Sequence, residues 1–153
     1  MTVEPFRIER YFATREFTTP HLLGVSDCET RSVSELLALD PGASERLKRL
    51  RLGYTESPGN PRLRQTVASQ YRGLDPDDVL VHNAAVEVLL TVSLAVLEPG
   101  DHAVIHHPGY QAQRTAPEIA GARVSSWWAR RENGWRPDLD ELAALLDEPR
   151  TRL

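Results

Sequence analysis

The most apolar part of the chain lies between residues 77 and 98, and its periodicity changes partway along. Residues 79–81 (Val-Leu-Val) form a compact apolar run, which predicts a short strand buried on both faces. From residue 84 to residue 97 polar residues are few. They recur at four- and seven-residue steps, which would place them near one side of a helix. That spacing predicts a nearly all-apolar, buried helix that follows the strand directly.

The junction between this strand and this helix is a candidate binding site. The first backbone N–H groups of a helix have no partner inside the helix, and the helix dipole adds positive potential beside them. Residues 83–86 (Asn-Ala-Ala-Val) therefore predict an anion site that suits a phosphate group. Judged by itself, the junction also fits an ordinary helix start without a ligand.

The rest of the chain alternates between helical and extended patterns. Asn60 before Pro61 predicts a capped helix start, and Pro117 predicts a kink or a break in the helix around it. The predicted helices span residues 7–13, 34–39, 44–52, 61–72, 111–120 and 138–147, and further strands span residues 103–105 and 122–129, with another starting at 150–153. This order predicts an α/β fold with a parallel-type sheet and flanking helices. Because the chain stops where a strand begins, we expect an incomplete, apparently truncated domain.

The composition is ordinary for a soluble globular protein and narrows the classes of partner. The 153 residues are 41% hydrophobic and 26% charged, with a net charge of −4 and a pI of about 5.7. These values argue against binding to nucleic acid or to an anionic membrane. No apolar run reaches a membrane-spanning length, and the first ten residues lack the apolar core of a signal peptide. The single cysteine, Cys28, fits the reducing cytoplasm, where we expect the protein to be.

Histidines are the candidate metal ligands of this sequence. His82, His102, His106 and His107 lie at or near the ends of predicted strands. None of them has a cysteine or a carboxylate at the spacing that metal sites use, so we expect no metal site.

Four short motifs follow one another along the chain. They are a stretch from Tyr54 to Leu63-Arg64 with Gly59 inside it, the Asn-Ala-Ala-Val-Glu junction at 83–87, the turn Glu-Pro-Gly-Asp at 98–101, and the loop His-Pro-Gly-Tyr at 107–110. Together they resemble the class I and II aminotransferases, which are fold-type-I enzymes dependent on pyridoxal 5'-phosphate (PLP). In that family a Y-x-x-x-x-G-x-x-x-L-R stretch, a G-A-x-E helix start, an L-x-P-G-D turn and a P-x-Y loop follow in this order. The resemblance runs from about residue 52 to residue 153.

The resemblance implies the large domain of a fold-type-I, PLP-dependent transferase, and here only its N-terminal part. Residues 1–43 would form an N-terminal arm, and residues 44–153 an incomplete PLP-binding large domain. The implied substrates of the full-length protein are an amino acid and a 2-oxo acid, between which an amino group is transferred.

Five positions match functional residues of the family. Ala84, Ala85 and Val86 match the helix start whose N–H groups bind the cofactor phosphate, although the family usually has glycine at the position of Ala84. Tyr110 matches the aromatic residue that stacks on the pyridine ring. Tyr54 matches a tyrosine that reaches the phosphate of the partner subunit, which implies a homodimer. From the residues alone, Tyr110 also fits a core tyrosine, and Tyr54 a surface residue beside a helix.

The lysine that joins the cofactor covalently lies downstream of all four motifs in this family. Lysine and arginine total 18 here, and one of them is lysine, Lys48, which leaves 17 arginines. Lys48 lies among arginines on a helix face that we expect to be exposed, where nothing would activate its amine. We therefore expect no catalytic residue in this chain and no activity of the chain alone.

Two other functions remain open. A PLP-dependent lyase, or another enzyme that is not a transaminase, can use the same scaffold, because the part that holds the cofactor does not determine the reaction. Alternatively, the chain is a non-catalytic, truncated piece that binds a phosphate group.

Overall fold

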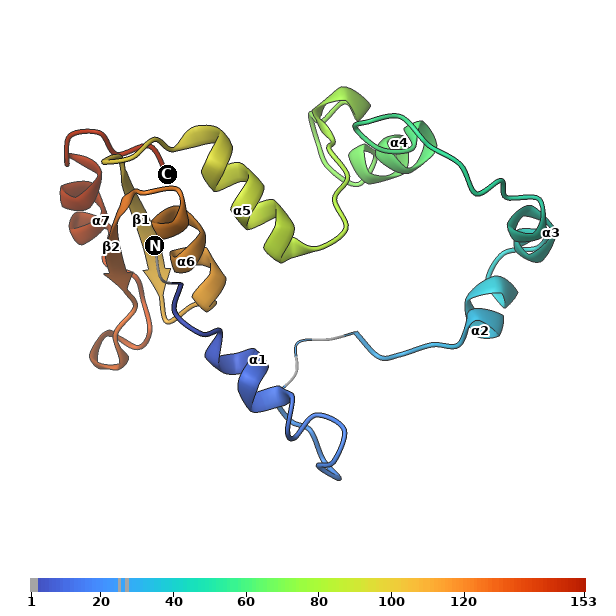
Figure 1. Ribbon diagram of the computed structural model, residues 1–153, viewed down its shortest axis with the longest axis horizontal. Coiled ribbons are helices and arrows are strands. Elements are labelled where there is room, and N and C mark those ends of the chain that lie inside the picture. The colour runs from blue at the N-terminus through green and yellow to red at the C-terminus, as the bar shows by residue number, and fades with distance from the viewer. Residues whose placement is uncertain (1–2, 25, 27) are drawn as a thin grey trace. The chain divides into compact units, whose positions relative to one another are not determined.

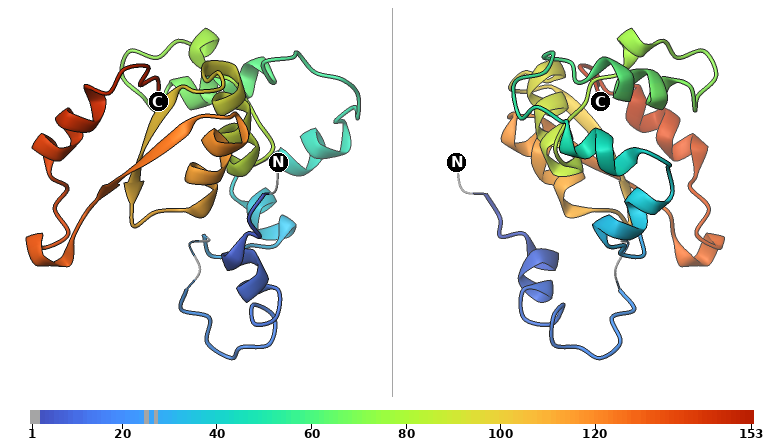
Figure 2. Two further views of the ribbon diagram at one scale, coloured as in Figure 1. Left: turned by 60° about the vertical axis from the view of Figure 1, so that its left-hand side comes forward. Right: turned by 90° about the vertical axis from the view of Figure 1, so that its right-hand side faces the viewer.

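The computed structural model describes residues 3–24, 26 and 28–153, which divide into two compact units. One unit comprises the described part of Met1–Arg15 together with His82–Leu153, and the other comprises the described part of Glu16–Val81. The elements of both units are labelled in Figure 1, and Figure 2 shows them from two further sides. The predicted division at residues 43 and 44 stays a prediction.

The first unit is built on a parallel sheet. Strand β1 (His102–His107) pairs in parallel with β2 (Arg123–Trp128), with His102 opposite Arg123 and His107 opposite Trp128. Figure 1 shows the two arrows side by side and pointing the same way. The prediction of a parallel sheet with flanking helices is confirmed.

The end of the chain pairs with the other side of β1. The N–H of His102 donates to the carbonyl of Arg150 at 2.9 Å, and the carbonyl of His102 accepts from the N–H of Arg152 at 2.9 Å. One step further, the N–H of Val104 donates to the carbonyl of Leu153 at 2.7 Å. The pairing is parallel but is an isolated bridge at Thr151, not a third strand of the sheet. It leaves β1 hydrogen-bonded on both sides.

Helices α5 (Ala85–Val96) and α6 (Gln111–Ile119) accompany this sheet. α6 connects β1 to β2 and contacts both strands, and it also packs against α5. Pro117 lies inside α6 without splitting it, although its missing N–H removes one i→i−4 hydrogen bond, to the carbonyl of Gln113. Its ring is fully buried, so it contributes to the core instead.

Two shorter helices complete the first unit. α1 (Arg7–Phe12) belongs to the N-terminal segment, and α7 (Leu139–Leu146) contacts β2. A short 3-10 helix, η2 (Arg131–Asn133), precedes α7. α7 begins where the Asp138 carboxylate accepts hydrogen bonds from the N–H groups of its first turn, at 2.9 and 3.2 Å. The predicted helix at 138–147 is thus confirmed.

The core of the first unit is thin and rich in alanine. Its buried apolar residues are Leu97, Ala103, Ile105, Ala112, Ala116, Ala122 and Ala129. Small side chains allow the helices to approach the sheet closely, but each buries little apolar area. The unit therefore depends on hydrogen bonding within the sheet as well as on apolar packing.

The prediction that residues 84–97 form a buried helix is right about the helix and wrong about burial. Of the residues of α5, Ser93 is the one that is buried, whereas Val92, Leu94 and Val96 are between 40% and 57% exposed. Within its unit α5 packs against α6, which covers only one stripe of this mostly apolar helix. No helix of the described residues is long and apolar enough to cross a membrane.

The second unit consists of short helices and the segments between them. They are α2 (Val33–Ala38), α3 (Ala43–Lys48), α4 (Pro61–Ala68) and the 3-10 helix η1 (Pro76–Asp78). Ser32 caps α2, with its hydroxyl accepting from the N–H of Glu35 at 3.2 Å and its own N–H donating to the Glu35 carboxylate at 2.6 Å. The amide oxygen of Asn60 caps α4 by accepting from the N–H groups of Arg62 at 3.0 Å and Leu63 at 3.4 Å, with Pro61 in the first turn as predicted.

The strand predicted at Val79, Leu80 and Val81 does not form. Leu80 is 60% exposed, and no strand of the described residues lies alongside to pair with this segment. Instead the N–H of Val81 donates to the carbonyl of Pro58 at 2.9 Å, and the carbonyl of Val79 accepts from Nε of Arg64 at 2.9 Å. An apolar run becomes a buried strand only where a neighbouring strand forms hydrogen bonds with its backbone N–H and C=O groups. No such strand lies beside residues 79–81 in the described part of the chain, which is why the prediction was wrong here.

Candidate functional site

The start of α5 presents unpaired backbone donors. Its N-cap is Ala84, whose carbonyl accepts from the N–H of Val88 at 3.2 Å. Among the described residues no group accepts a hydrogen bond from the N–H of Ala85, Val86 or Glu87. An anion placed here would gain these donors together with the positive end of the helix dipole.

The resemblance noted in the sequence predicts glycine at the position of Ala84, but the backbone there does not require glycine. Its φ of −152° and ψ of 152° are those of extended chain, which any residue adopts. The side chain of Ala84 is exposed. The alanine therefore presents its N–H without backbone strain.

A carboxylate fixes the direction in which the chain enters α5. Oε2 of Glu87 accepts from the N–H of Asn83 at 2.9 Å and lies 4.0 Å from Nδ1 of His82. Glu87 is the third residue of the helix, so this bond resembles one half of a capping box. Sequence reasoning did not assign this role to Glu87, although the four-residue spacing to Asn83 was its signal.

Tyr110 lies in the loop that leaves β1 and begins α6. Its ring is 5.1 Å from that of Phe6, at an interplanar angle of 60°, and Tyr110 is 37% exposed. Burial, and after it the Glu9 carboxylate, raise the pKa of the Tyr110 phenol. The phenol is thus a neutral aromatic group at physiological pH.

The loop before Tyr110 turns tightly at Gly109. A Cβ at this position would lie 2.6 Å from the carbonyl oxygen of His106, too close for any side chain. Glycine therefore lets the chain fold back over the end of β1 and place Tyr110 directly beyond the strand.

Tyr110 and the start of α5 lie toward the same edge of the sheet. α5 runs opposite to β1, so its first residues and the carboxyl end of β1 point the same way (Figure 1). Ligands of parallel α/β sheets bind at this carboxyl edge.

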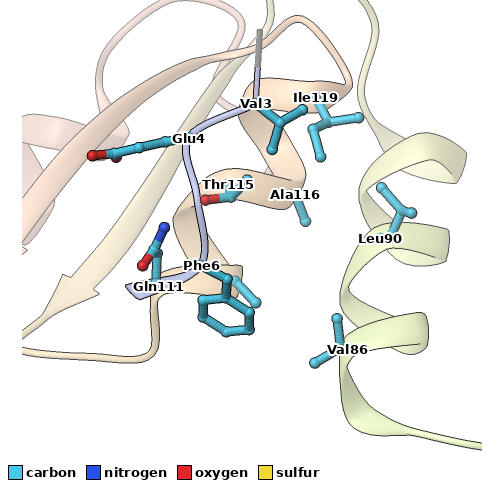
Figure 3. Close-up of a pocket in the computed structure, with 10 residues that line it drawn as sticks. Val3, Glu4, Phe6, Val86, Leu90, Gln111, Thr115, Ala116 and Ile119 are labelled. Carbon is cyan, nitrogen blue, oxygen red and sulfur yellow. The ribbon is translucent and has the colours of Figure 1, made fainter. Parts of the chain in front are cut away.

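A cavity of about 160 Å³ lies between α5, α6 and the N-terminal segment (Figure 3). Val86 and Leu90 line it from α5, and Phe6 faces it from the N-terminal segment. Because Phe6 also touches the Tyr110 ring, one side chain links Tyr110 with the first turn of α5. Sequence reasoning did not identify Phe6, since nothing in its neighbourhood along the chain indicates this contact.

Tyr54 and Lys48 belong to the second unit. The side chain of Tyr54 is fully exposed, and its predicted role at the phosphate of a partner subunit stays a prediction. Lys48 is exposed as expected, and its amine forms an ion pair with Glu45 at 2.7 Å.

The histidines of β1 are engaged in packing and hydrogen bonding within the sheet. His102, 1% exposed, bonds through Nδ1 to the hydroxyl of Thr151 at 2.7 Å and through Nε2 to that of Ser125 at 2.8 Å. His107 stacks on Trp128 at 4.8 Å, and burial, followed by Arg114 and His106, lowers its pKa. The part of the chain that the structure describes holds no cluster of three His, Cys, Asp or Glu side chains suited to a metal ion.

Comparison with known proteins identifies the family. The model of the family described as aminotransferase class I and II matches residues 23–153. The chain belongs to this family, and its sheet and helices are those of a fold-type-I PLP-dependent transferase. Membership implies PLP as the cofactor.

Several relatives match nearly the whole chain. Capreomycidine synthase of Streptomyces vinaceus is 33% identical over 148 residues, which are 95% of this chain and 38% of the synthase. A solved PLP-dependent aminotransferase from Streptococcus suis matches 99% of this chain and 41% of its own, with 30% identity and a TM-score of 0.88. The solved PLP-dependent cyclase OrfR matches 99% of this chain and 39% of its own, with 25% identity and a TM-score of 0.83. The chain thus spans about two fifths of the length of these relatives.

Proposed function

We propose that this chain is the cofactor-holding part of a PLP-dependent aminotransferase that moves an amino group between an amino acid and a 2-oxo acid. The observation that supports this most directly is the start of α5. Its unpaired N–H groups lie toward the same edge of the sheet as Tyr110, within a chain of the class I and II aminotransferase family.

The proposed roles follow from the chemistry of each group. The backbone N–H groups of Ala84, Ala85 and Val86 bind the cofactor phosphate, and the ring of Tyr110 stacks on the pyridine ring. Tyr54 contacts the phosphate of a partner subunit, so the intact protein is a homodimer. When bound, PLP supplies an electron-withdrawing ring that stabilises negative charge on the substrate carbon.

Covalent attachment of the cofactor needs a lysine, which this chain does not supply in a suitable place. Lys48 is exposed and paired with Glu45, and an amine that attacks a carbonyl must be unprotonated. We infer that the lysine of the reaction is outside these 153 residues and that this chain alone does not catalyse the reaction. Borohydride reduction of the intact protein with PLP, followed by peptide mapping, tests this. A stoichiometric label on Lys48 would contradict it.

The phosphate role of α5 can be tested by removing one donor without breaking the helix. Ala85→Pro deletes the N–H at the first helical position, where proline is well tolerated, and the extended Ala84 before it suits proline. Loss of one hydrogen bond to a charged group should weaken PLP binding about ten- to a hundredfold. Leu139→Pro, the same change at the first position of α7, is the control and should leave the affinity unchanged. Equal PLP affinity in Ala85→Pro and the unmodified protein would show that the phosphate binds elsewhere.

A second candidate is a PLP-dependent reaction other than transamination. It is favoured by the relatives named capreomycidine synthase and PLP-dependent cyclase, which match 95% and 99% of this chain. Product analysis of the intact protein with an amino acid and a 2-oxo acid separates the two. Transfer of the amino group with release of a new 2-oxo acid supports the aminotransferase, whereas an eliminated or cyclised product without transfer rejects it.

A further inference from the structure

Gln111, the first residue of α6, holds the N-terminal segment by two hydrogen bonds. Its Oε1 accepts from the backbone N–H of Arg7 at 3.0 Å, and its Nε2 donates to the carbonyl of Pro5 at 3.1 Å. The N–H of Arg7 is one of the donors that the first turn of α1 leaves unpaired. The side-chain amide therefore binds the chain on both sides of a single residue, Phe6.

The start of α1 has few other anchors. None of the residues of α1 is buried, and its N-cap, Phe6, makes no side-chain cap. The ion pair between Arg7 and Glu4 is exposed and joins neighbours within the segment itself. The position of this segment on the first unit thus depends on Gln111 and on the ring of Phe6.

The Phe6 ring connects the N-terminal segment to Tyr110 by a direct ring contact. Figure 3 shows the segment from Val3 to Phe6 running beside α6, with Phe6 and Val86 facing the same cavity. The edge-to-face contact of 5.1 Å between Phe6 and Tyr110 limits how the Tyr110 ring can turn. Glu9, on the same α1, acts on the Tyr110 phenol through its charge.

We propose that Gln111 and Phe6 are positioning residues for Tyr110: Gln111 fastens the chain on either side of Phe6, and Phe6 sets the orientation of the Tyr110 ring at the cofactor edge. The contacts of Gln111 with the N-terminal segment, and of Phe6 with Tyr110, are present in this chain without a ligand. Its consequence for the cofactor rests on the proposed role of Tyr110. A ring that is already oriented loses less freedom when a planar ligand stacks on it.

The test compares Gln111→Ala with Gln65→Ala in the intact protein. Gln65 is an exposed residue of α4 whose side chain makes no hydrogen bond within the described residues, so it is a matched control. Three quantities are measured. They are the amide hydrogen exchange of residues 7–12 without cofactor, the pKa of Tyr110 by ultraviolet titration against a Tyr110→Phe background, and the affinity for PLP.

For Gln111→Ala we expect about tenfold faster exchange, because two hydrogen bonds that hold the segment are gone. The pKa of Tyr110 should fall toward its ordinary value as Phe6 and Glu9 move away, and PLP affinity should fall several-fold. Gln111→Glu keeps the acceptor for Arg7 and loses the donor to Pro5, so its exchange should lie between those of Gln111→Ala and the unmodified protein.

The outcomes separate this proposal from the proposed function. Unchanged exchange in Gln111→Ala, or faster exchange with an unchanged Tyr110 pKa, overturns the positioning role. Faster exchange with a lower pKa but full PLP affinity supports the positioning of the ring and rejects the stacking role of Tyr110.

A second variant removes the ring and keeps the two hydrogen bonds. In Phe6→Leu the exchange of residues 7–12 should change less than in Gln111→Ala. The pKa of Tyr110 should fall, but less far than in Gln111→Ala, because Glu9 stays in place. Phe6→Tyr keeps an aromatic ring at this position and should restore the Tyr110 pKa. A Tyr110 pKa that is the same in Phe6→Leu and Phe6→Tyr would contradict the role of the ring contact.

Discussion

The hydrogen bonds of the sheet unit reach further along the chain than those of the unit of residues 16–81, where the described bonds reach at most from Val81 to Pro58. In the sheet unit, the imidazole of His102 joins Ser125 to Thr151, side chains that are 23 and 49 residues away from it. In the other unit, the caps of α2 and α4 join residues two or three apart. Local sequence therefore specifies the helices of the second unit, whereas the first unit exists only when distant segments meet.

The two units also differ in what they bury. The sheet unit encloses Ala103 completely and buries the polar side chains of Asp101 and His102, which are hydrogen-bonded to Arg150, Ser125 and Thr151. In the second unit the buried residues are Gly59 and Ala68, as far as the structure describes it. Buried polar groups are costly when they lose a partner, so the sheet unit should be the more sensitive of the two to single substitutions.

The largest effect is expected from His102→Ala. It removes a fully buried ring and leaves the hydroxyls of Ser125 and Thr151 without that partner, which should lower the free energy of unfolding by about 3–5 kcal/mol. Amide exchange resolved by peptide should rise in the sheet unit and stay unchanged in residues 16–81. His106→Ala, at an exposed position of the same strand, is the control and should cost less than about 1 kcal/mol. Equal losses in the two variants would show that the His102 bridge contributes little.

A smaller effect, in the other unit, is expected from Gly59→Ala. Gly59 has a φ of +113°, and a Cβ there would lie 2.5 Å from Cγ2 of Val81. Backbone strain and overpacking together should cost about 2–3 kcal/mol, measured as faster exchange around α4. Gly53→Ala, where a Cβ meets nothing within 4 Å and φ is ordinary, should be close to neutral. If exchange in the sheet unit rose as much as around α4, the two units would not respond separately.

The smallest of the three effects is expected from the pH dependence of Asp101→Asn. The Glu98 N–H at 2.7 Å and the Arg150 guanidinium at 2.8 Å hold the pKa of Asp101 below its ordinary value of 3.8. A depressed pKa in the folded state means that the stabilisation is complete above the ordinary value and is lost as the pH falls through the folded value. Asp101→Asn should therefore flatten the loss of stability below about pH 4, read as the urea midpoint of the sheet unit. An unchanged acid profile in Asp101→Asn would rule out this carboxylate as a source of acid sensitivity.

The same difference in reach explains what could be predicted from the sequence. Asn60 before Pro61 and Asp138 mark helix starts correctly because a cap involves only its neighbours. The parallel pairing of β1 and β2 follows from the strand–helix–strand order. The strand at residues 79–81 and the burial of α5 were predicted wrongly, because both depend on which distant segments lie alongside.

Prediction of the candidate site was limited in the same way. The pattern predicts a helix from residue 84, and in the structure Ala84 is the N-cap and the helix begins at Ala85. The cofactor roles of Ala84, Ala85, Val86, Tyr110 and Tyr54 stay predictions. The attachment of Phe6 and Gln111 escaped sequence reasoning because the residues that meet there are more than a hundred positions apart.

The position of β1 between β2 and residues 150–153 has a consequence for the order in which the molecule is built. During synthesis, α2, α3 and α4 can close their short loops soon after they leave the ribosome, since their bonds reach only a few residues. β1 must wait until Thr151 has emerged before its second side is covered. Until then the nascent chain exposes an unpaired strand edge, which makes this interval the one in which chaperones matter most to it.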